Sequence, residues 1–308
     1  MEPDLSVQIA KIKMKNPIMP ASGTFGYGEE ISNFIDLSEL GAAVTKGITF
    51  EPRKGNPPPR IVETDAGMIN SIGLQNPGVE EVIKEKIPFL KGFGIPIIIN
   101  ICGATLEEYV RLTERLNKVE GIAGVEVNIS CPNTQKGGIA FGQDPNIAYE
   151  TIFRIKKVAD PKITIVAKLT PNVTNIVNIA RAVKIAGADA ISLINTVRAR
   201  AKVRGKDETW LNGGLSGLAI KPIALKLVHE VAQANLGIPI IGIGGIRNVT
   251  DVLDFLECGA DAVQVGTANF IDPKTMIKLI SGLREYMKKK NYSNINELKK
   301  GERNGSER

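Results

Sequence analysis

The sequence predicts an α/β fold, a single (β/α)8 TIM barrel whose active site lies at the C-terminal ends of the strands. Eight short apolar runs alternate with longer helical patterns along almost all of the 308 residues, and no linker-like stretch interrupts them. Aromatic residues make up only 5% of the chain, so aliphatic residues must build the core. The phrases AGADA at 186–190 and CGADA at 258–262 introduce two of the runs, which indicates repeated βα units.

Each predicted strand is a β-rich apolar run, and a segment of helical periodicity follows nearly every one. The predicted strands span 17–22, 42–45, 95–101, 124–129, 163–169, 190–195, 239–244 and 262–266. The predicted helices span 29–40, 78–91, 105–119, 144–158, 172–186, 219–234, 249–258 and 273–289. A doubly wound sheet is the other fold with this pattern, but it carries G-x-G-x-x-G after its first strand, which here ends Ala21-Ser22-Gly23. We expect the barrel over residues 1–287 and a basic, polar tail over 288–308.

The net charge of +6 does not by itself indicate a nucleic-acid partner, because two stretches contain most of the basic excess. Residues 288–308 have seven Lys or Arg against three Glu, and residues 198–206 have five basic residues and no acid. The first stretch is typical of a solvated or frayed terminus rather than a binding arm. We therefore expect no nucleic-acid partner.

Cysteine usage and hydropathy indicate a cytoplasmic protein. Three cysteines, Cys102, Cys131 and Cys258, cannot form a disulfide framework and lack the C-x-x-C spacing of a zinc site. The first twenty residues have no signal or transit pattern, and no run approaches the roughly 18 apolar residues of a membrane span. We expect a reduced compartment, no metal site and no membrane association.

Polar residues and glycines gather where the predicted strands finish, which is where catalytic groups lie in this barrel. An ordinary capping loop explains any one of the Ser, Thr or Asn residues taken alone. All eight ends together indicate a functional site at this face. In chain order the ends present Ser22, Lys46, Asn100, Asn128 with Cys131, Lys168, Asn195 with Thr196, Gly244 with Gly245, and Gly266 with Thr267.

The last two strand ends predict a phosphate site. Loops after strands 7 and 8 of such barrels commonly bind phosphate through backbone amides, and Gly244-Gly245 and Gly266-Thr267 suit that role; two tight turns are the alternative. A phosphate there places the rest of a cofactor across the barrel mouth, where Lys46 and Lys168 emerge with no carboxylate among the strand ends to pair with them. A fixed positive charge beside a redox ring stabilises its anionic reduced form, which suggests flavin mononucleotide (FMN).

The phrase NISCPN, residues 128–133, carries the sharpest chemical signal. A lone cysteine is commonly a small buried hydrophobe, but Cys131 lies just past a strand end and between two amide side chains. A thiol there acts either as a nucleophile or as a general base. A nucleophile generally needs a base nearby, and the only histidine, His229, lies in a helix-like segment, which favours proton abstraction by Cys131.

A second amide-rich phrase, NSIGLQNPG at 70–78, lies in the long connection between the second and third strands. Together with Asn128, Asn133 and Asn195 it predicts a site lined by neutral amides. Each amide offers donors and an acceptor, which matches a ring of alternating N–H and C=O groups such as a pyrimidinedione. For Asn76, which precedes a proline, a turn-forming role is the better interpretation.

Nine phrases between Asn16 and Ala268 together resemble the class 1 dihydroorotate dehydrogenases. They are NPIMPASGTFGYG, VTKGITFEPRKGNPPPRIVET, NSIGLQNPG, NISCPNTQKGG, KLTPN, SLINT, GGLSG, IGIGGI and VQVGTA. The cysteine and the NTQKGG continuation resemble the type B catalytic subunit. That resemblance implies oxidation of (S)-dihydroorotate to orotate in pyrimidine (UMP) biosynthesis, one FMN per chain and NAD as final acceptor. It also implies a homodimer within a heterotetramer, whose partner subunit carries FAD and a 2Fe–2S cluster, because this chain has too few cysteines for the cluster.

The resemblance also implies roles for single residues. Cys131 removes a proton from C5 of dihydroorotate while hydride passes from C6 to N5 of FMN, and Lys168 lies near N1 and O2 of the flavin. The residues expected to bind the cofactor are Ser22, Lys46, Gly47, Asn100, Asn128, Lys168, Ile194, Gly217, Gly244, Gly245, Gly266 and Thr267. The residues expected to bind the substrate are Lys46, Asn70, Ser71, Ile72, Gly73, Leu74, Asn128, Asn133, Asn195 and Thr196.

One segment departs from the family pattern. After Asn195-Thr196 the chain reads VRARAKVRGKDETWLN in place of a Gly-Met-Ala-Ile-Asp type phrase and a longer hairpin. Three roles are open for its basic residues: they attract the substrate, they contact the partner, or they only cover a solvated loop.

Two other functions compete with dihydroorotate oxidation. A tRNA dihydrouridine synthase is also an FMN barrel with a catalytic cysteine, but it normally adds an RNA-binding helical domain, for which few residues remain here. A non-enzymatic phosphate-binding barrel leaves the Lys, Asn and Cys residues at the strand ends without a purpose.

Overall fold

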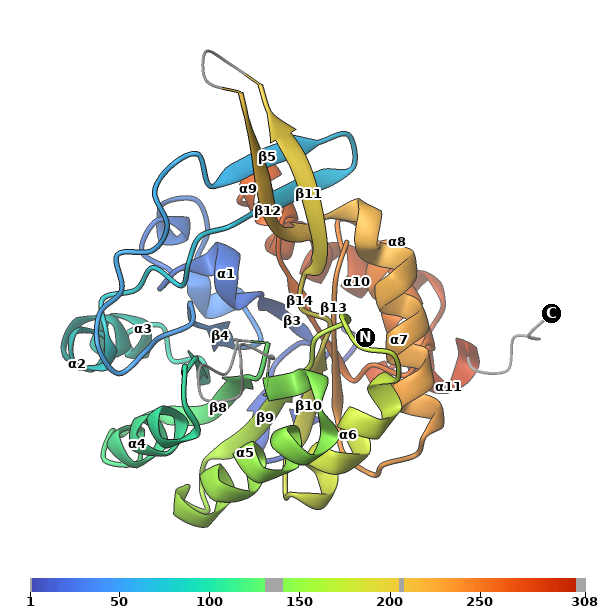
Figure 1. The fold of residues 1–308 in the computed structure, drawn as a ribbon. Coiled ribbons are helices and arrows are strands. Elements are labelled where there is room, and N and C mark those ends of the chain that lie inside the picture. Colours follow the sequence, from blue (N-terminus) through green and yellow to red (C-terminus); the bar gives the residue numbers. More distant parts are fainter. Residues whose placement is uncertain (1, 131–140, 205–207, 303–308) are drawn as a thin grey trace.

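The computed structural model describes residues 2–130, 141–204 and 208–302. Its centre is a sheet of eight parallel strands in the order β3-β14-β13-β10-β9-β8-β7-β4. The Gly41 amide, just before β4, donates to the Ile18 carbonyl of β3 at 2.9 Å, so the two end strands also meet. The strands are β3 (Ile18–Pro20), β4 (Ala43–Val44), β7 (Ile97–Ile101), β8 (Ile122–Asn128), β9 (Thr164–Lys168), β10 (Ala190–Leu193), β13 (Ile240–Ile243) and β14 (Ala262–Val265). The predicted barrel and all eight predicted strands are confirmed, and Figure 1 shows the helices around them.

The barrel strands are apolar on both faces, because one face packs against helices and the other fills the barrel interior. β7, β9, β10, β13 and β14 are buried at every position. Few polar side chains interrupt this pattern: apart from Thr164 at the start of β9, the buried ones on the barrel strands are Asn100, Glu126, Lys168, Ser192 and Gln264. These exceptions belong to the site described below.

Six long helices pack around the strands: α4 (Leu106–Leu116), α5 (Pro145–Val158), α6 (Ile176–Ile185), α7 (Lys221–Gln233), α8 (Val249–Glu257) and α10 (Thr275–Lys289). Side chains of Thr105, Asp144, Asn175 and Asn248 begin four of them by accepting backbone N–H groups of the first turn. The Asn175 cap explains why α6 starts four residues after the predicted start at 172. Within the described ranges, no helix has the length and apolar character needed to cross a bilayer.

Two predicted helices differ from those observed. The segment 29–40 forms two separate 3₁₀ turns, η1 (Ile31–Asn33) and η2 (Leu37–Glu39), because the Asp36 side chain accepts from the Ser38 amide and starts a new turn. The segment 78–91 divides into α2 (Val79–Glu81), a π-helical stretch η3 (Val82–Lys86) and α3 (Ile87–Lys91). Pro88 lies in the first turn of α3 and has no N–H for an i−4 hydrogen bond, so the helical hydrogen-bond pattern is interrupted there.

Six strands outside the barrel were not predicted. β1 (Val7–Ile9) and β2 (Ile12–Met14) form an N-terminal hairpin. A second sheet, antiparallel and ordered β11-β12-β6-β5, is built from β5 (Ile61–Thr64), β6 (Gly67–Asn70), β11 (Val197–Val203) and β12 (Thr209–Ser216). It comes from the connections that follow β4 and β10, and Figure 1 shows it at the top of the barrel beside α1 (Ser22–Phe25) and α9 (Ala268–Ile271). The described residues of the departing stretch VRARAKVRGKDETWLN therefore lie mostly on β11 and β12, and residues 205–207 lie outside the described ranges.

The C-terminal segment packs against the barrel as far as the structure describes it. The predicted boundary at 287 falls inside α10, and a further helix, α11 (Ile295–Glu302), follows. Ile295 and Leu298 are fully buried, and the Ile295 amide donates to the Asp4 carbonyl at 3.1 Å. The expectation of a solvated tail is wrong for this part, because two apolar residues one helical turn apart give α11 a face that packs into the core.

We predict that Leu298→Ala lowers the free energy of unfolding by about 2–4 kcal/mol, because it removes a fully buried side chain and leaves a cavity. Asn296→Ala on the exposed side of the same helix is the control and should change stability by about 0.5 kcal/mol or less. Urea unfolding of both variants provides the measurement. Equal stabilities of the two variants would contradict the packing of α11.

Candidate active site

The predicted site residues line one cavity of about 1080 Å3 at the C-terminal ends of the barrel strands. This volume is at the upper end of the range for ligand pockets. All residues predicted to bind a cofactor contribute to the lining, and so do Asn70, Ser71, Ile72, Gly73, Leu74, Asn195 and Thr196 from the predicted substrate set. β5 and β6 supply further lining residues, so the antiparallel sheet borders the cavity. The remaining two predicted residues, Cys131 and Asn133, lie outside the described residues.

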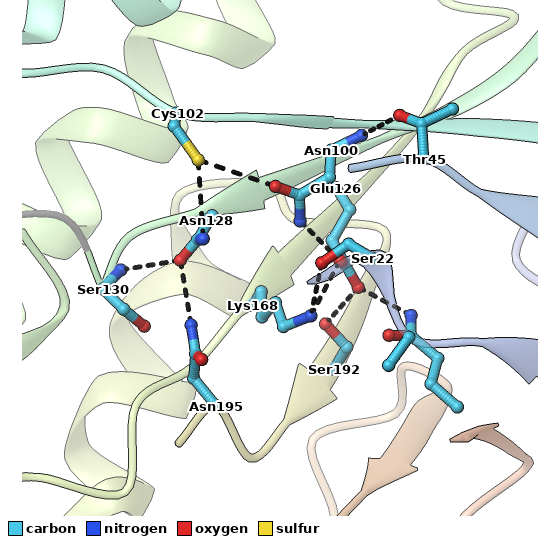
Figure 2. Close-up of polar contacts among 12 residues, drawn as sticks. Ser22, Thr45, Asn100, Cys102, Glu126, Asn128, Ser130, Lys168, Ser192 and Asn195 are labelled. Atoms are coloured by element: carbon cyan, nitrogen blue, oxygen red, sulfur yellow. Dashed lines mark hydrogen bonds and ion pairs between the residues drawn. The ribbon is translucent and has the colours of Figure 1, made fainter. Parts of the chain in front are cut away.

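The floor of the cavity is built on a buried carboxylate. Glu126 lies on β8 with no exposed surface, and Lys168, at the end of β9, donates to its Oε1 at 3.1 Å. Asn100 donates to the same oxygen at 2.6 Å, while Ser192 and Gln264 donate to Oε2 at 2.8 and 2.7 Å. Five strands of the barrel thus meet at one carboxylate, as Figure 2 shows for the labelled members of this group.

The charges of this pair are held in place by their surroundings. Burial by itself raises the pKa of Glu126. The Lys168 ammonium and the three side-chain hydrogen bonds lower the pKa by more than burial raises it, so it lies below its ordinary value. Lys168 also donates to Ser22 Oγ at 3.3 Å, at the start of α1. The expectation that the two strand-end lysines have no carboxylate partner is therefore wrong for Lys168, since its partner lies one layer deeper in the barrel.

The sequence reasoning missed Glu126, Ser192 and Gln264. The polar pattern at the strand ends does not include them, because they lie inside the strands. A signal existed for one of them: Glu126 precedes Asn128 by two residues, and alternation along a strand places both on the same face. A carboxylate in an otherwise apolar strand, on the face of a predicted site residue, indicates a buried charge with a partner.

Above the floor, amide side chains form one wall of the cavity. Asn128 at the end of β8 accepts hydrogen bonds through Oδ1 from Asn195 Nδ2 and the Ser130 amide, both at 3.2 Å. Its Nδ2 donates to Cys102 Sγ at 3.5 Å, and the Cys102 thiol in turn donates to Asn100 Oδ1 at 3.6 Å. This thiol was not predicted as part of the site. It links the amide that binds Glu126 to the amides of the wall.

Lys46 brings a second cation into the cavity, from the residues that follow β4. Burial, together with the positive charge of Arg60, lowers the pKa of Lys46 below its ordinary value. Within the described part of the chain Lys46 forms no salt bridge. Nearby, Ser130 Oγ is buried without a hydrogen-bond partner among these residues and lines the same cavity. Both groups are available to an anionic or polar ligand.

Glycines form the opposite rim. Gly245 has φ of 73°, and a Cβ there would lie 2.6 Å from Lys221 Cβ and 3.0 Å from the Gly217 carbonyl oxygen, so only glycine fits. At Gly266 an added Cβ would meet only the Ala21 Cβ, at 3.6 Å, so the backbone there is open toward the cavity. The rim therefore offers bare backbone to a ligand.

Ion pairs between α7 and α8 hold the loop that follows this rim. Lys221 contacts the carboxylates of Asp251 and Asp254, and Asp251 also accepts from the Arg247 and Asn248 amides at 2.8 and 2.9 Å. Burial raises the pKa of Asp251, but the hydrogen bonds from Lys221 and these amides outweigh that effect and hold it below its ordinary value. Asp251 is therefore ionised near neutral pH, and the loop keeps its shape.

The predicted substrate segment, residues 70–74, is held by hydrogen bonds to β12 and to the residue just before β5. Asn70 Nδ2 donates to the Gly214 carbonyl on β12 at 3.2 Å, and the Ser71 amide donates to the Arg60 carbonyl at 2.8 Å. These bonds keep the loop at the cavity edge.

Asn76, by contrast, has the turn-forming role that the sequence predicts. Its Oδ1 accepts from the Gly78 and Thr49 amides at 2.9 and 3.1 Å, and its Nδ2 donates to the Leu74 carbonyl at 2.7 Å. The Asn76 side chain uses its hydrogen bonds to hold the backbone of this turn and is not directed to a ligand.

His229 lies on α7, as predicted, and not in this cavity. It lines a separate hollow of about 700 Å3 with Asn235, Cys258 and Asp261, at the N-terminal ends of β10 and β13. Among the described residues, no group of three or more His, Cys, Asp or Glu is arranged to hold a metal ion.

Comparison with known proteins shows which family shares this architecture. The family model described as dihydroorotate dehydrogenase matches residues 4–287. A protein of Geotalea uraniireducens named dihydroorotate dehydrogenase B (NAD(+)), catalytic subunit, is 51% identical over 300 residues, which are 96% of this chain and 97% of that protein. A protein of Listeria monocytogenes with the same name is 50% identical over 299 residues, with the same coverage of both chains.

The match runs through the barrel and includes both the lysine–carboxylate floor and the glycine rim. Identity of this degree over nearly the whole chain leaves no large region unaccounted for. The protein is a member of the dihydroorotate dehydrogenase family, whose members are flavin-dependent oxidoreductases.

Proposed function

We propose that this protein oxidises (S)-dihydroorotate to orotate with one bound FMN, a reaction of pyrimidine (UMP) biosynthesis, and passes the electrons to NAD through a partner subunit. The observation that carries the proposal is one cavity that joins a charged floor, an amide wall and a glycine rim. Family membership supports dihydroorotate as the substrate.

The residues present fit an FMN. Gly244-Gly245 and Gly266-Thr267 offer backbone amides to its phosphate, and Gly266 has open space beside it. Lys168 offers a fixed positive charge to the N1 and O2 edge of the ring. When bound, the flavin supplies the acceptor for the hydride that leaves C6 of dihydroorotate.

The substrate is proposed to bind between the amide wall and the loop at 70–74. Among the described residues Asn70 and Asn195 each keep a donor and an acceptor for a ligand, whereas Asn128, whose Oδ1 already accepts twice, keeps one Nδ2 N–H. Together these groups match the N–H and C=O groups of the dihydropyrimidine ring. Lys46, which has no carboxylate partner among the described residues, is suited to the substrate carboxylate. An analogue that lacks either ring N–H would leave an amide unpaired, and this provides selectivity.

For the proton at C5 we propose Cys131 as general base, by analogy with the family motif NISCPN. Cys131 itself lies outside the described residues, and it directly follows Ser130, which lines the cavity. The thiolate would take the C5 proton and become the thiol, the C5–H electron pair would form the C5=C6 double bond, and the hydrogen on C6 would leave with its bonding pair as hydride to the flavin. Asn133, two residues further on, remains a proposed substrate contact.

The names of the relatives contain the words catalytic subunit, which implies a partner subunit. We propose that the partner carries FAD and a 2Fe–2S cluster and that two copies of this chain form a homodimer within a heterotetramer. A cytoplasmic location and the absence of nucleic-acid and membrane partners complete the proposal. A tRNA dihydrouridine synthase, the alternative function, is not favoured, because both the family model and the relatives are dihydroorotate dehydrogenases.

We predict that the purified chain, loaded with FMN, is reduced by dihydroorotate under anaerobic conditions with one orotate formed per flavin. Bleaching of the oxidised flavin spectrum measures the reduced flavin, and chromatography measures the orotate formed in the same turnover. The same preparation incubated with dihydrouridine-containing tRNA is the control and should remain oxidised. Flavin that is bleached by the tRNA and not by dihydroorotate would assign the chain to the alternative function.

We predict that Cys131→Ala retains FMN but lowers turnover by about 10²–10⁴-fold, the usual contribution of a positioned base. Cys131→Ser should retain more activity at high pH than near neutrality, because a hydroxyl is a poorer base than a thiol. Flavin content and a pH profile of turnover provide the readouts. Turnover of the alanine variant equal to that of the unaltered chain would reject the base assignment.

We predict that Gly266→Leu weakens FMN binding about tenfold or more, which corresponds to about 1.4 kcal/mol. A Cβ at this position meets only Ala21, so the substitution starts without a clash, and the rest of the leucine side chain is expected to occupy the space proposed for the phosphate. Gly266→Ala adds one methyl group and is the matched control, with at most about a threefold effect. Full flavin retention by a folded Gly266→Leu variant would show that the phosphate binds elsewhere.

A further inference from the structure

The chemistry proposed above uses Lys168 but gives no task to the carboxylate that binds it. We propose that Glu126 is a positioning residue, which holds the Lys168 ammonium at the cavity floor and partly neutralises it, and so sets how readily the bound flavin is reduced. This inference rests on the proposed function, because it requires a flavin above Lys168.

The geometry leaves Lys168 little freedom. Its ammonium contacts Glu126 Oε1 at 3.1 Å and Ser22 Oγ at 3.3 Å, and the side chain is only 5% exposed. Asn100 and Gln264 in turn fix the two oxygens of the carboxylate. The lysine that reaches the cavity is therefore directed by a group that does not line the cavity itself.

Stability alone does not account for this arrangement. A fully buried ion pair loses much of its Coulomb attraction to the cost of removing both charges from water, and well-packed apolar residues commonly replace such pairs without loss of stability. The surrounding barrel interior is apolar and could have been closed with Val or Ile. A charged lysine held at one place, beside a ring that gains negative charge on reduction, gives the pair a purpose in the reaction.

The sign of the effect follows from the position of the two charges. Reduction places negative charge on the flavin, and Lys168, at the cavity, lies closer to it than Glu126, which lies below. The lysine therefore favours the reduced form, and the carboxylate offsets part of that effect. Removing the charge of Glu126 while Lys168 keeps its own should make the flavin easier to reduce.

The test is a potentiometric titration of the FMN-loaded protein with dithionite and a reference dye, which needs no substrate. We expect Glu126→Gln to shift the reduction equilibrium about tenfold toward reduced flavin, about 30 mV for a two-electron couple. In a Lys168→Met background the same substitution should shift it by less than about twofold, because burial without the lysine raises the pKa of Glu126 and leaves the carboxyl neutral, so that glutamine removes no charge. Glu126→Asp keeps the charge but withdraws it by one methylene group, and should give a smaller shift in the same direction. It also serves as the test if Glu126→Gln does not fold.

Asp189→Asn is the matched control. Asp189 binds Lys156 at 3.0 Å just before β10 begins, so its removal changes charge by the same amount at the other end of the barrel strands. It should leave the reduction equilibrium within about twofold of the unaltered chain.

Three results would overturn the inference: a shift of less than about twofold in Glu126→Gln, a shift toward oxidised flavin, or equal shifts in the Lys168 and Lys168→Met backgrounds. Failure of the proposed function has a different signature. In that case the unaltered chain either binds no FMN or holds an FMN that dihydroorotate does not reduce. If only the inference about Glu126 fails, the unaltered chain still binds FMN and dihydroorotate still reduces it.

Discussion

One carboxylate without contact to water constrains the interior of this barrel. An isolated buried charge is expensive, so every lone pair of Glu126 has to be met by a donor, and the donors come from four other strands and include one cation. Each donor is fixed by that requirement. Lys168 points to the cavity floor and not to solvent, and Asn100 turns its amide nitrogen toward the carboxylate and its oxygen toward Cys102.

The constraint extends from the floor to the wall through side chains in contact. Cys102 receives a hydrogen bond from Asn128, and Asn128 orients Asn195 on the neighbouring part of the cavity. A ligand therefore meets amides whose donors and acceptors are already oriented before it binds, which reduces the ordering cost of binding. The rim is built differently. Its glycines have no side chains, so the backbone itself faces the cavity, and the ion pairs of Lys221 with α8 support that backbone on the side away from the cavity.

The sequence was sufficient for the barrel and for most of the cavity lining because both depend on periodic or local signals. Strands and helices alternate visibly, and polar residues at strand ends stand out against apolar runs. Three features had no such signal. The antiparallel sheet pairs segments more than a hundred residues apart, such as Gly214 with Asn70. The packing of α11 depends on two apolar residues in a basic stretch. The partner of Lys168 lies on another strand, and pairing across strands follows from register, which the sequence does not display.

In the complex we propose, Lys168, directed by Glu126, lies against the flavin while the glycine rim holds its phosphate. A crystal structure of the chain with FMN and orotate tests this most directly. We expect Lys168 Nζ within hydrogen-bond distance, about 2.7–3.2 Å, of the N1 and O2 edge of the flavin, with the phosphate against the backbone of Gly245 and Gly266. A flavin whose ring lies away from Lys168, or whose phosphate lies on another face of the barrel, would contradict it.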